Sequence, residues 1–223
     1  MKGVIFFTVV VLSGIQLLQA QEFTYQPSLR DQLLYGSVEL QTDSLPQMPK
    51  RKLLPDNISF MENGLWGENW IFRTTGLASP LTPESRKSEL ALRRAMLTAH
   101  QIGGFVTLGS MITAVYFGQQ LIDGNYGYRR NHQIFVTATI ISYTGTGLLA
   151  VLSPPPMIRR NEMSTTTIHK TLAWVHFAGM VLTPILGASI GRRATTSQIA
   201  HFHQASAYIT TAALAASLIV ITF

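Results

Sequence analysis

The chain has 223 residues, of which 47% are apolar and 13% are charged; it contains no cysteine and has a formal net charge of +6. The charge is divided unevenly. Residues 1–90 carry eight Lys/Arg and nine Asp/Glu, whereas residues 91–223 carry nine Lys/Arg and two Asp/Glu. Soluble surfaces are roughly a quarter to a third charged, so the second segment excludes an ordinary soluble enzyme. The lack of cysteine excludes disulfides, iron–sulfur clusters and thiolate metal sites.

The N-terminus has the pattern of a secretory signal peptide. Lys2 precedes an apolar stretch over residues 3–18, and Ala20 follows as a small residue at the candidate cleavage point. A positive start, a short apolar core and a small residue are typical of such a signal, which we expect to span residues 1–20. The alternative is an uncleaved fifth membrane helix. We expect residues 21–81 to form a partly ordered extracytoplasmic arm.

A long helix is predicted to begin at Thr82-Pro83-Glu84. Thr82 supplies a capping hydroxyl, Pro83 has no N–H to leave unpaired, and Glu84 is favoured at the positive end of the helix dipole. No helix-breaking residue follows before Asp123-Gly124. We therefore assign residues 82–223 to one membrane domain.

Four apolar runs follow, over about residues 95–117, 132–152, 168–190 and 201–222. Each is close to the roughly 20 residues that cross a hydrocarbon core of about 30 Å. The connections are short and rich in Gly, Pro and Asn, so consecutive helices should be antiparallel neighbours. The predicted fold is all-α: an antiparallel four-helix transmembrane bundle, preceded by the signal peptide and the short arm.

The basic residues of this domain come mainly as arginine pairs beside the apolar runs, the first of them at Arg93-Arg94 and the last at Arg192-Arg193. This distribution is typical of loops at a bilayer surface, and no nucleic-acid motif accompanies it. We expect an integral protein of a bacterial inner membrane that contacts lipid and binds no nucleic acid. The signal peptide would place the arm outside the cytoplasm.

All histidines of the chain lie in the membrane domain, where ionisable residues are costly and mark candidate functional sites. One histidine lies near the start of each predicted span, and two more lie close to these. Because consecutive spans run in opposite directions, the first and third spans would place a histidine near one membrane face, and the second and fourth near the other. The six are His100, His132, His169, His176, His201 and His203.

Three of these histidines are followed four positions later by a small residue: Gly104, Ala173 and Ala207. A missing side chain one turn along the same face leaves room for a flat, wide group; close helix packing in lipid is the alternative explanation. Two histidines can fill both axial positions of a haem iron, which leaves a centre that only gains and loses electrons. The arginine pairs could neutralise haem propionates.

The histidine pattern resembles the cytochrome b561 family of transmembrane electron carriers. The similarity lies in His100, His132, His169 and His203, and in the stretch from His169 to Ala173, which is similar to the family's pattern of histidine, basic residue, any residue, leucine and small residue. The resemblance covers about residues 90–223. It implies two b-type haems with these four histidines as iron ligands, and electron transfer between a donor and an acceptor on opposite membrane faces.

Two ligand assignments have alternatives. His176 lies seven residues after His169, within about 20° on the same helical face, and is the runner-up as the partner of His100. His201 is the runner-up to His203, and the two lie about 200° apart on a helix, so only one can face the bundle. Histidine spacing favours His169 and His203.

Other functions fit the same sequence less well. The main alternative is a haem- or quinone-linked membrane anchor subunit of a larger oxidoreductase, and a homodimer or a larger redox complex would fit either function. A histidine path for a transition metal would need carboxylates, and the spans contain none. No nucleophile and acid pattern for hydrolysis is present, so any enzymatic activity would be that of a transmembrane oxidoreductase.

Overall fold

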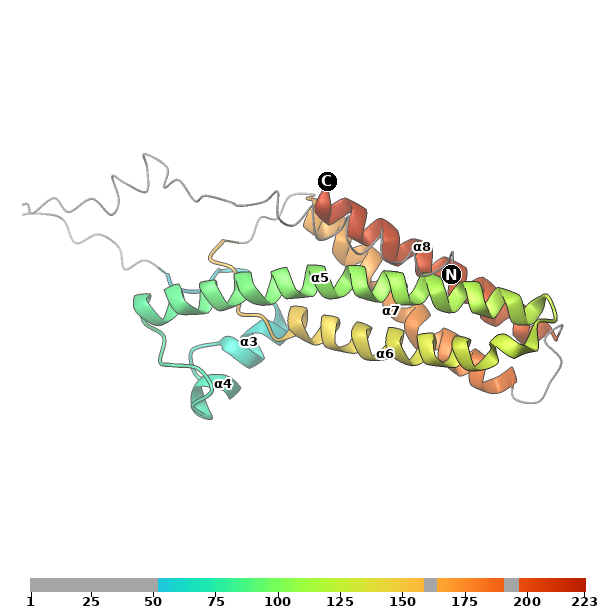
Figure 1. Cartoon of the computed structure of the whole chain (residues 1–223). Coiled ribbons are helices and arrows are strands. Elements are labelled where there is room, and N and C mark those ends of the chain that lie inside the picture. The colour runs from blue at the N-terminus through green and yellow to red at the C-terminus, as the bar shows by residue number, and fades with distance from the viewer. Residues whose placement is uncertain (1–51, 159–163, 191–196) are drawn as a thin grey trace, which may run out of the picture.

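The computed structural model describes residues 52–158, 164–190 and 197–223 (Figure 1). The expected signal peptide at residues 1–20 and the first part of the arm, residues 21–51, lie outside the described residues. The described residues are helical, with no strand among them. Four of the helices are long and apolar enough to cross a membrane, which confirms the predicted four-helix transmembrane bundle.

Two short helices precede the bundle. Helix α3 (Phe60–Trp66) begins with a capping box: the Ser59 hydroxyl accepts from the Glu62 backbone N–H, and the Glu62 carboxylate accepts from the Ser59 N–H. Such reciprocal bonds satisfy two free donors at a helix start. Helix α4 (Ile71–Thr74) follows after a short turn. The second part of the expected arm is therefore folded.

This pair of short helices, the cap, is fastened to one end of the bundle. The Trp66 indole N–H donates to the backbone carbonyl of Leu152, 3.1 Å away, where α6 ends. The buried Glu89 carboxylate meets Arg86 at 2.7 Å and Arg73 at 2.8 Å, the second contact without hydrogen-bond alignment. Charges removed from water must be paired, so this cluster fixes α4 to the bundle.

Helix α5 (Pro83–Ile122) starts at the predicted position. The Thr82 hydroxyl accepts from the Ser85 backbone N–H at 3.2 Å, and Pro83 is the first helical residue. The helix ends before Asp123, and Gly124 adopts a φ of 87°, a left-handed conformation that favours glycine. A single 3₁₀ turn, η1 (Tyr126–Tyr128), then leads into α6.

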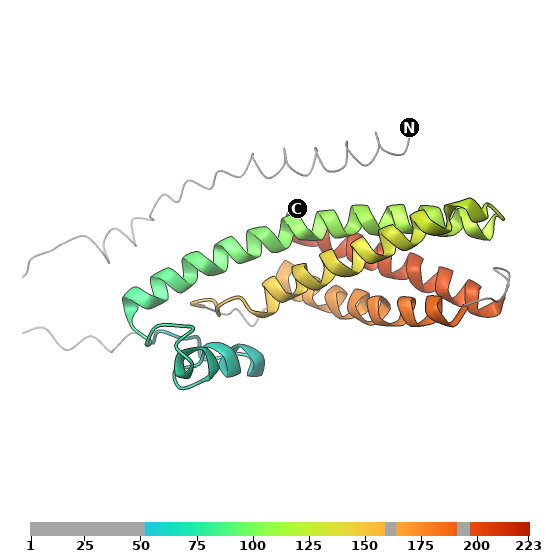
Figure 2. The same ribbon diagram turned by 60° about the horizontal axis from the view of Figure 1, so that its bottom comes forward.

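The other three spans are α6 (Arg129–Val151), α7 (Thr165–Ile190) and α8 (Gln198–Thr222). Helix α5 packs along α6, α7 packs along α8, and the two hairpins meet where α5 touches α8. In both ribbon views the start of α5 extends past the end of α6, on the side where the cap lies (Figures 1 and 2). The bundle therefore consists of two helical hairpins.

The bundle is apolar outside and contains small or polar residues inside. Trp174, Ile141 and Ile209 are among its exposed apolar side chains, whereas Thr107 and Thr210 are fully buried. Each buried threonine hydroxyl donates to a carbonyl four residues earlier in its own helix, Thr107 at 2.8 Å and Thr210 at 2.6 Å. The hydrophobic effect does not drive helices to associate in lipid, so close packing of small interface residues and internal hydrogen bonds stabilise such bundles.

Glycines allow the closest approaches within the hairpins. A Cβ at Gly103 of α5 would overlap the side chain of Thr146 on α6, and a Cβ at Gly179 of α7 would overlap that of Thr210 on α8. Gly145 of α6, by contrast, faces open space. The hairpins thus pack at a distance that only glycine permits at these points.

We expect Gly179→Ala to lower stability by about 1–3 kcal/mol, because the new methyl overpacks the α7–α8 contact. Gly145→Ala should instead be neutral or stabilising by up to about 1 kcal/mol, the usual gain from replacing glycine inside a helix. Thermal unfolding of both variants in detergent micelles measures this difference in sign. Equal stabilisation by both substitutions would show that the α7–α8 contact is looser than the structure indicates.

Candidate functional site

Four histidines meet as two facing pairs inside the bundle. His100 of α5 faces His169 of α7, with ring centroids 6.1 Å apart and ring planes 86° apart. His132 of α6 faces His203 of α8, with centroids 6.2 Å apart and planes 85° apart. Both pairs join alternate helices, as the sequence predicts. The first pair lies toward the cap, and the second toward η1.

All four rings are held by the same kind of hydrogen bond. The Nδ1 of His100 lies 2.8 Å from the Thr146 carbonyl, and that of His132 lies 2.8 Å from the Ala114 carbonyl. A carbonyl oxygen only accepts, so Nδ1 must carry the proton in these rings. The lone pair is then on Nε2, the nitrogen that remains available to a metal.

The second hairpin repeats this arrangement. His169 Nδ1 lies 3.0 Å from the Ser217 carbonyl and 2.8 Å from the Ser217 hydroxyl, and His203 Nδ1 lies 2.9 Å from the Thr183 carbonyl. Each of the four bonds reaches from one helix of a hairpin to the other. Packing of each hairpin therefore sets the direction of its two rings.

The spacing within each pair suits one metal ion held between two imidazoles. An imidazole nitrogen binds a transition metal at about 2.0–2.1 Å and lies roughly 1.1 Å from the ring centre, so two such rings have centroids about 6.3 Å apart. The observed values of 6.1 and 6.2 Å agree with this. Perpendicular ring planes are compatible with a shared axis, since each plane needs only to contain that axis.

A cavity of about 670 Å³ surrounds the His132–His203 pair and is lined by all four spans. Its walls are mainly apolar, and Gly118 and Gly187 lie beside the rings: a Cβ at Gly118 would come within 3.1 Å of His132, and one at Gly187 within 2.9 Å of His203. Small-molecule and cofactor sites have volumes of roughly 300–1,000 Å³ and mostly apolar walls. The cavity can therefore accept a flat apolar group between the rings.

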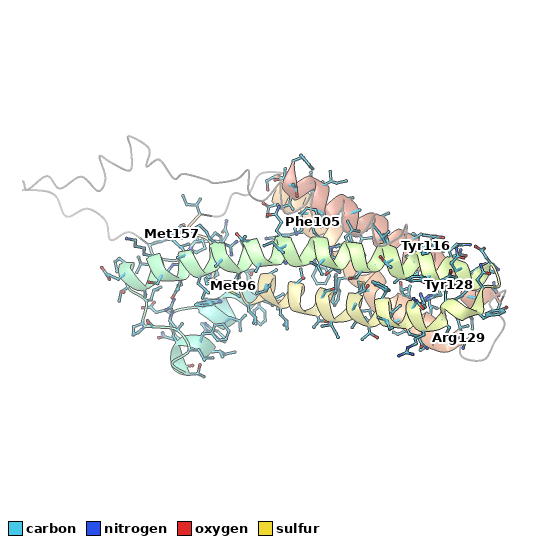
Figure 3. All side chains as sticks on the ribbon, in the orientation of Figure 1. Met96, Phe105, Tyr116, Tyr128, Arg129 and Met157 are labelled. Carbon is cyan, nitrogen blue, oxygen red and sulfur yellow. The ribbon has the colours of Figure 1, made fainter. Side chains whose placement is uncertain are left out.

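The outer end of this cavity is polar. The Gln119 carbonyl oxygen accepts from the Gln204 amide at 2.7 Å and from the Tyr208 hydroxyl at 2.8 Å, and this network joins α5 to α8. Among the lining residues only Arg129 is permanently charged. Figure 3 places Arg129 near Tyr128, at the end of the bundle where α5 turns into α6. Arg129 would therefore provide the counter-charge for a ligand with an acidic edge.

The two runner-up histidines lie elsewhere. His176 is buried and its Nδ1 lies 2.8 Å from the Tyr143 hydroxyl, whereas His201 is exposed on α8. The structure thus brings His169 opposite His100 and His203 opposite His132. Ligation of an iron by these four rings stays a prediction.

The two hairpins correspond residue by residue, a feature that the sequence analysis missed. Equivalent positions lie 69 residues apart between α5 and α7 and 71 residues apart between α6 and α8. In both halves the corresponding residues are the facing histidines, the residues whose carbonyls accept a hydrogen bond from these rings, and a glycine beside one ring. The pairs are His100 and His169, Ala114 and Thr183, Gly118 and Gly187, His132 and His203, and Thr146 and Ser217. A comparison of residues 100–146 with residues 169–217 would have found this repeat.

The described residues contain no cluster of three or more His, Cys, Asp or Glu suited to a bare metal ion. Comparison with models of known protein families, with curated proteins and with solved structures found no match. The functional argument therefore rests on the facing histidine pairs and the cavity.

Proposed function

We propose that the protein transfers electrons across a membrane through two b-type haems, each held by two histidines. His100 and His169 would hold one haem, and His132 and His203 the other. The supporting observation is that all four rings face a partner across the bundle while their Nδ1 atoms are bonded to backbone carbonyls. This leaves the Nε2 atom of each ring available to a metal ion, and the centroid distances of 6.1 and 6.2 Å match those of two imidazoles on one ion.

A bis-histidine haem supplies reversible one-electron chemistry without an open coordination position. The residues of this chain contribute the rest of the function. The carbonyls of Ala114, Thr146, Thr183 and Ser217 fix the ring directions and make the imidazoles more basic. The mainly apolar walls of the cavity provide a surface for the apolar faces of a haem beside the second pair.

The position of the pairs fits transfer across the bilayer. His100 and Ala114, whose carbonyl holds His132, are separated by fourteen residues of α5, or about 21 Å at 1.5 Å per residue. In a hydrocarbon core of about 30 Å, a separation of this length would place the two sites toward opposite faces. This arrangement is similar to that of the cytochrome b561 family, and we propose a bacterial inner membrane with the cap on the outer side.

Replacing single histidines tests the assignment. His100→Ala should remove the haem of the His169 pair, and His132→Ala should remove that of the His203 pair, because each haem loses one axial ligand. We expect about one haem per chain in either variant, compared with two in the parent, as measured by pyridine haemochrome assay and reduced-minus-oxidised spectra.

His201→Ala is the matched control, because His201 is exposed on the same helix as His203, and this variant should keep both haems. Circular dichroism of each variant distinguishes loss of one ligand from loss of the fold. A colourless parent protein from haem-replete cells, or His100→Ala and His132→Ala variants that fold and retain both haems, would refute the proposal.

Two adjacent arginines provide a second test. Both side chains are exposed, but Arg129 lines the cavity and its neighbour Arg130 does not. Exposed charge pairs contribute about 0.2–1 kcal/mol, so Arg129→Gln should weaken haem binding at the His132–His203 site by up to about fivefold, at about 1.4 kcal/mol per factor of ten. Arg130→Gln should leave it unchanged. Haem transfer to apomyoglobin measures both, and equal effects would exclude a specific role for Arg129.

A further inference from the structure

A tyrosine–histidine pair, made of the partly buried Tyr143 and the buried His176, lies between the two facing histidine pairs. The Tyr143 hydroxyl of α6 is 2.8 Å from His176 Nδ1 of α7, and their ring centroids are 5.6 Å apart with planes at 87°. His176 is 8% exposed. Placing such polar groups in hydrocarbon costs free energy, so an ionisable residue there marks a candidate functional site.

The pair lies close to both proposed haem sites. His176 follows His169 by seven residues and precedes Thr183, whose carbonyl holds His203, by another seven. Thr139 and Met180 line the inner end of the cavity, and each is one helical turn from Tyr143 or His176. The pair therefore lies between the two sites, at the inner end of the cavity.

The tyrosine–histidine pair is present in only one of the two halves of the repeat. The positions that correspond to His176 and Tyr143 in the other hairpin are Thr107, by the 69-residue offset, and Leu214, by the 71-residue offset. Both are buried. The hairpin architecture therefore forms without a tyrosine and a histidine at these positions, which separates the pair from the requirements of folding.

Helices α6, α7 and α8 contain no carboxylate, and those of α5, Glu84 and Glu89, lie at its start near the cap. The titratable groups nearest to His176 are Tyr143 on α6, His169 on its own helix and His100 on α5. Helix α8 carries no titratable side chain after Tyr208. Apart from the histidines assigned to haem, His176 is thus the basic group at this depth of the bundle that can take up a proton when a negative charge is added nearby.

We propose that the Tyr143–His176 pair is a proton-binding site coupled to reduction of the neighbouring haem site, an inference that rests on the proposed function. When a one-electron donor reduces that site, His176 takes up one proton from water and becomes an imidazolium. One electron and one proton arrive together, and both leave on reoxidation. The net charge inside the bundle is then unchanged.

The chemistry of the pair suits this exchange. A hydroxyl both donates and accepts hydrogen bonds, so the Tyr143 hydroxyl can donate to neutral His176 and accept from its protonated form by rotating. Charges interact strongly in a medium of low dielectric constant, so an added electron favours protonation nearby. Neither state leaves the Nδ1 of His176 without a partner.

Potentiometric titration of the purified haem protein at several pH values between about 6 and 8 tests the inference. In the parent, the reduction equilibrium of one haem should fall up to tenfold per pH unit, which is about 59 mV for a one-electron couple. His176→Thr, alone or with Tyr143→Leu, introduces the residues of the other hairpin and should remove this dependence. His201→Thr should preserve it.

Tyr143→Phe keeps the ring and removes only the hydroxyl, so this variant tests the inferred proton-binding site if His176→Thr does not fold. We expect it to shift the pH range of the dependence or to reduce its size. Two haems with pH-independent potentials in the parent, or an unchanged pH dependence in folded His176→Thr or Tyr143→Phe, would overturn the inference and leave the proposed function intact. A parent protein without haem would overturn both.

Discussion

In hydrocarbon, an imidazole N–H without an acceptor costs several kcal/mol, and this constraint organises the bundle. Each of the four paired rings meets it by bonding through Nδ1 to a carbonyl of the adjacent helix in its own hairpin. The same bond sets the tautomer and the ring direction, and it leaves the lone pair on Nε2. A single hydrogen bond thus satisfies the imidazole N–H and orients the ring.

Close packing inside each hairpin makes these bonds possible. Gly118 and Gly187 leave the space that the rings of His132 and His203 occupy, and Gly103 and Gly179 let the helices approach closely elsewhere. The hairpins themselves meet along α5 and α8, and the cavity between them remains lined by all four spans. A bulky group bound between the hairpins would require this combination of close packing within each hairpin and open space between the two.

The two halves share this design and differ at a few points. Tyr143 and His176 stand where the other half has Leu214 and Thr107, and Pro184 of α7 removes one helix hydrogen bond at the level of the cavity. The buried cluster of Arg73, Arg86 and Glu89 joins the cap to one end only. The two histidine pairs thus have different surroundings, which would give the two proposed haems different reduction potentials.

The sequence alone determined the class of protein, the number of spans, the start of α5 and the division of the histidines into two layers, because hydropathy, capping residues and helix direction are local properties. It left open whether His169 or His176 faces His100, since both lie on one helical face, and it did not reveal the partner of His176. Only the tertiary structure decided these points, because the Thr146, Ser217 and Tyr143 contacts join residues 33–48 positions apart. Such contacts depend on the axial offset between two packed helices. This offset is set by the glycine contacts between the helices and not by a local sequence pattern.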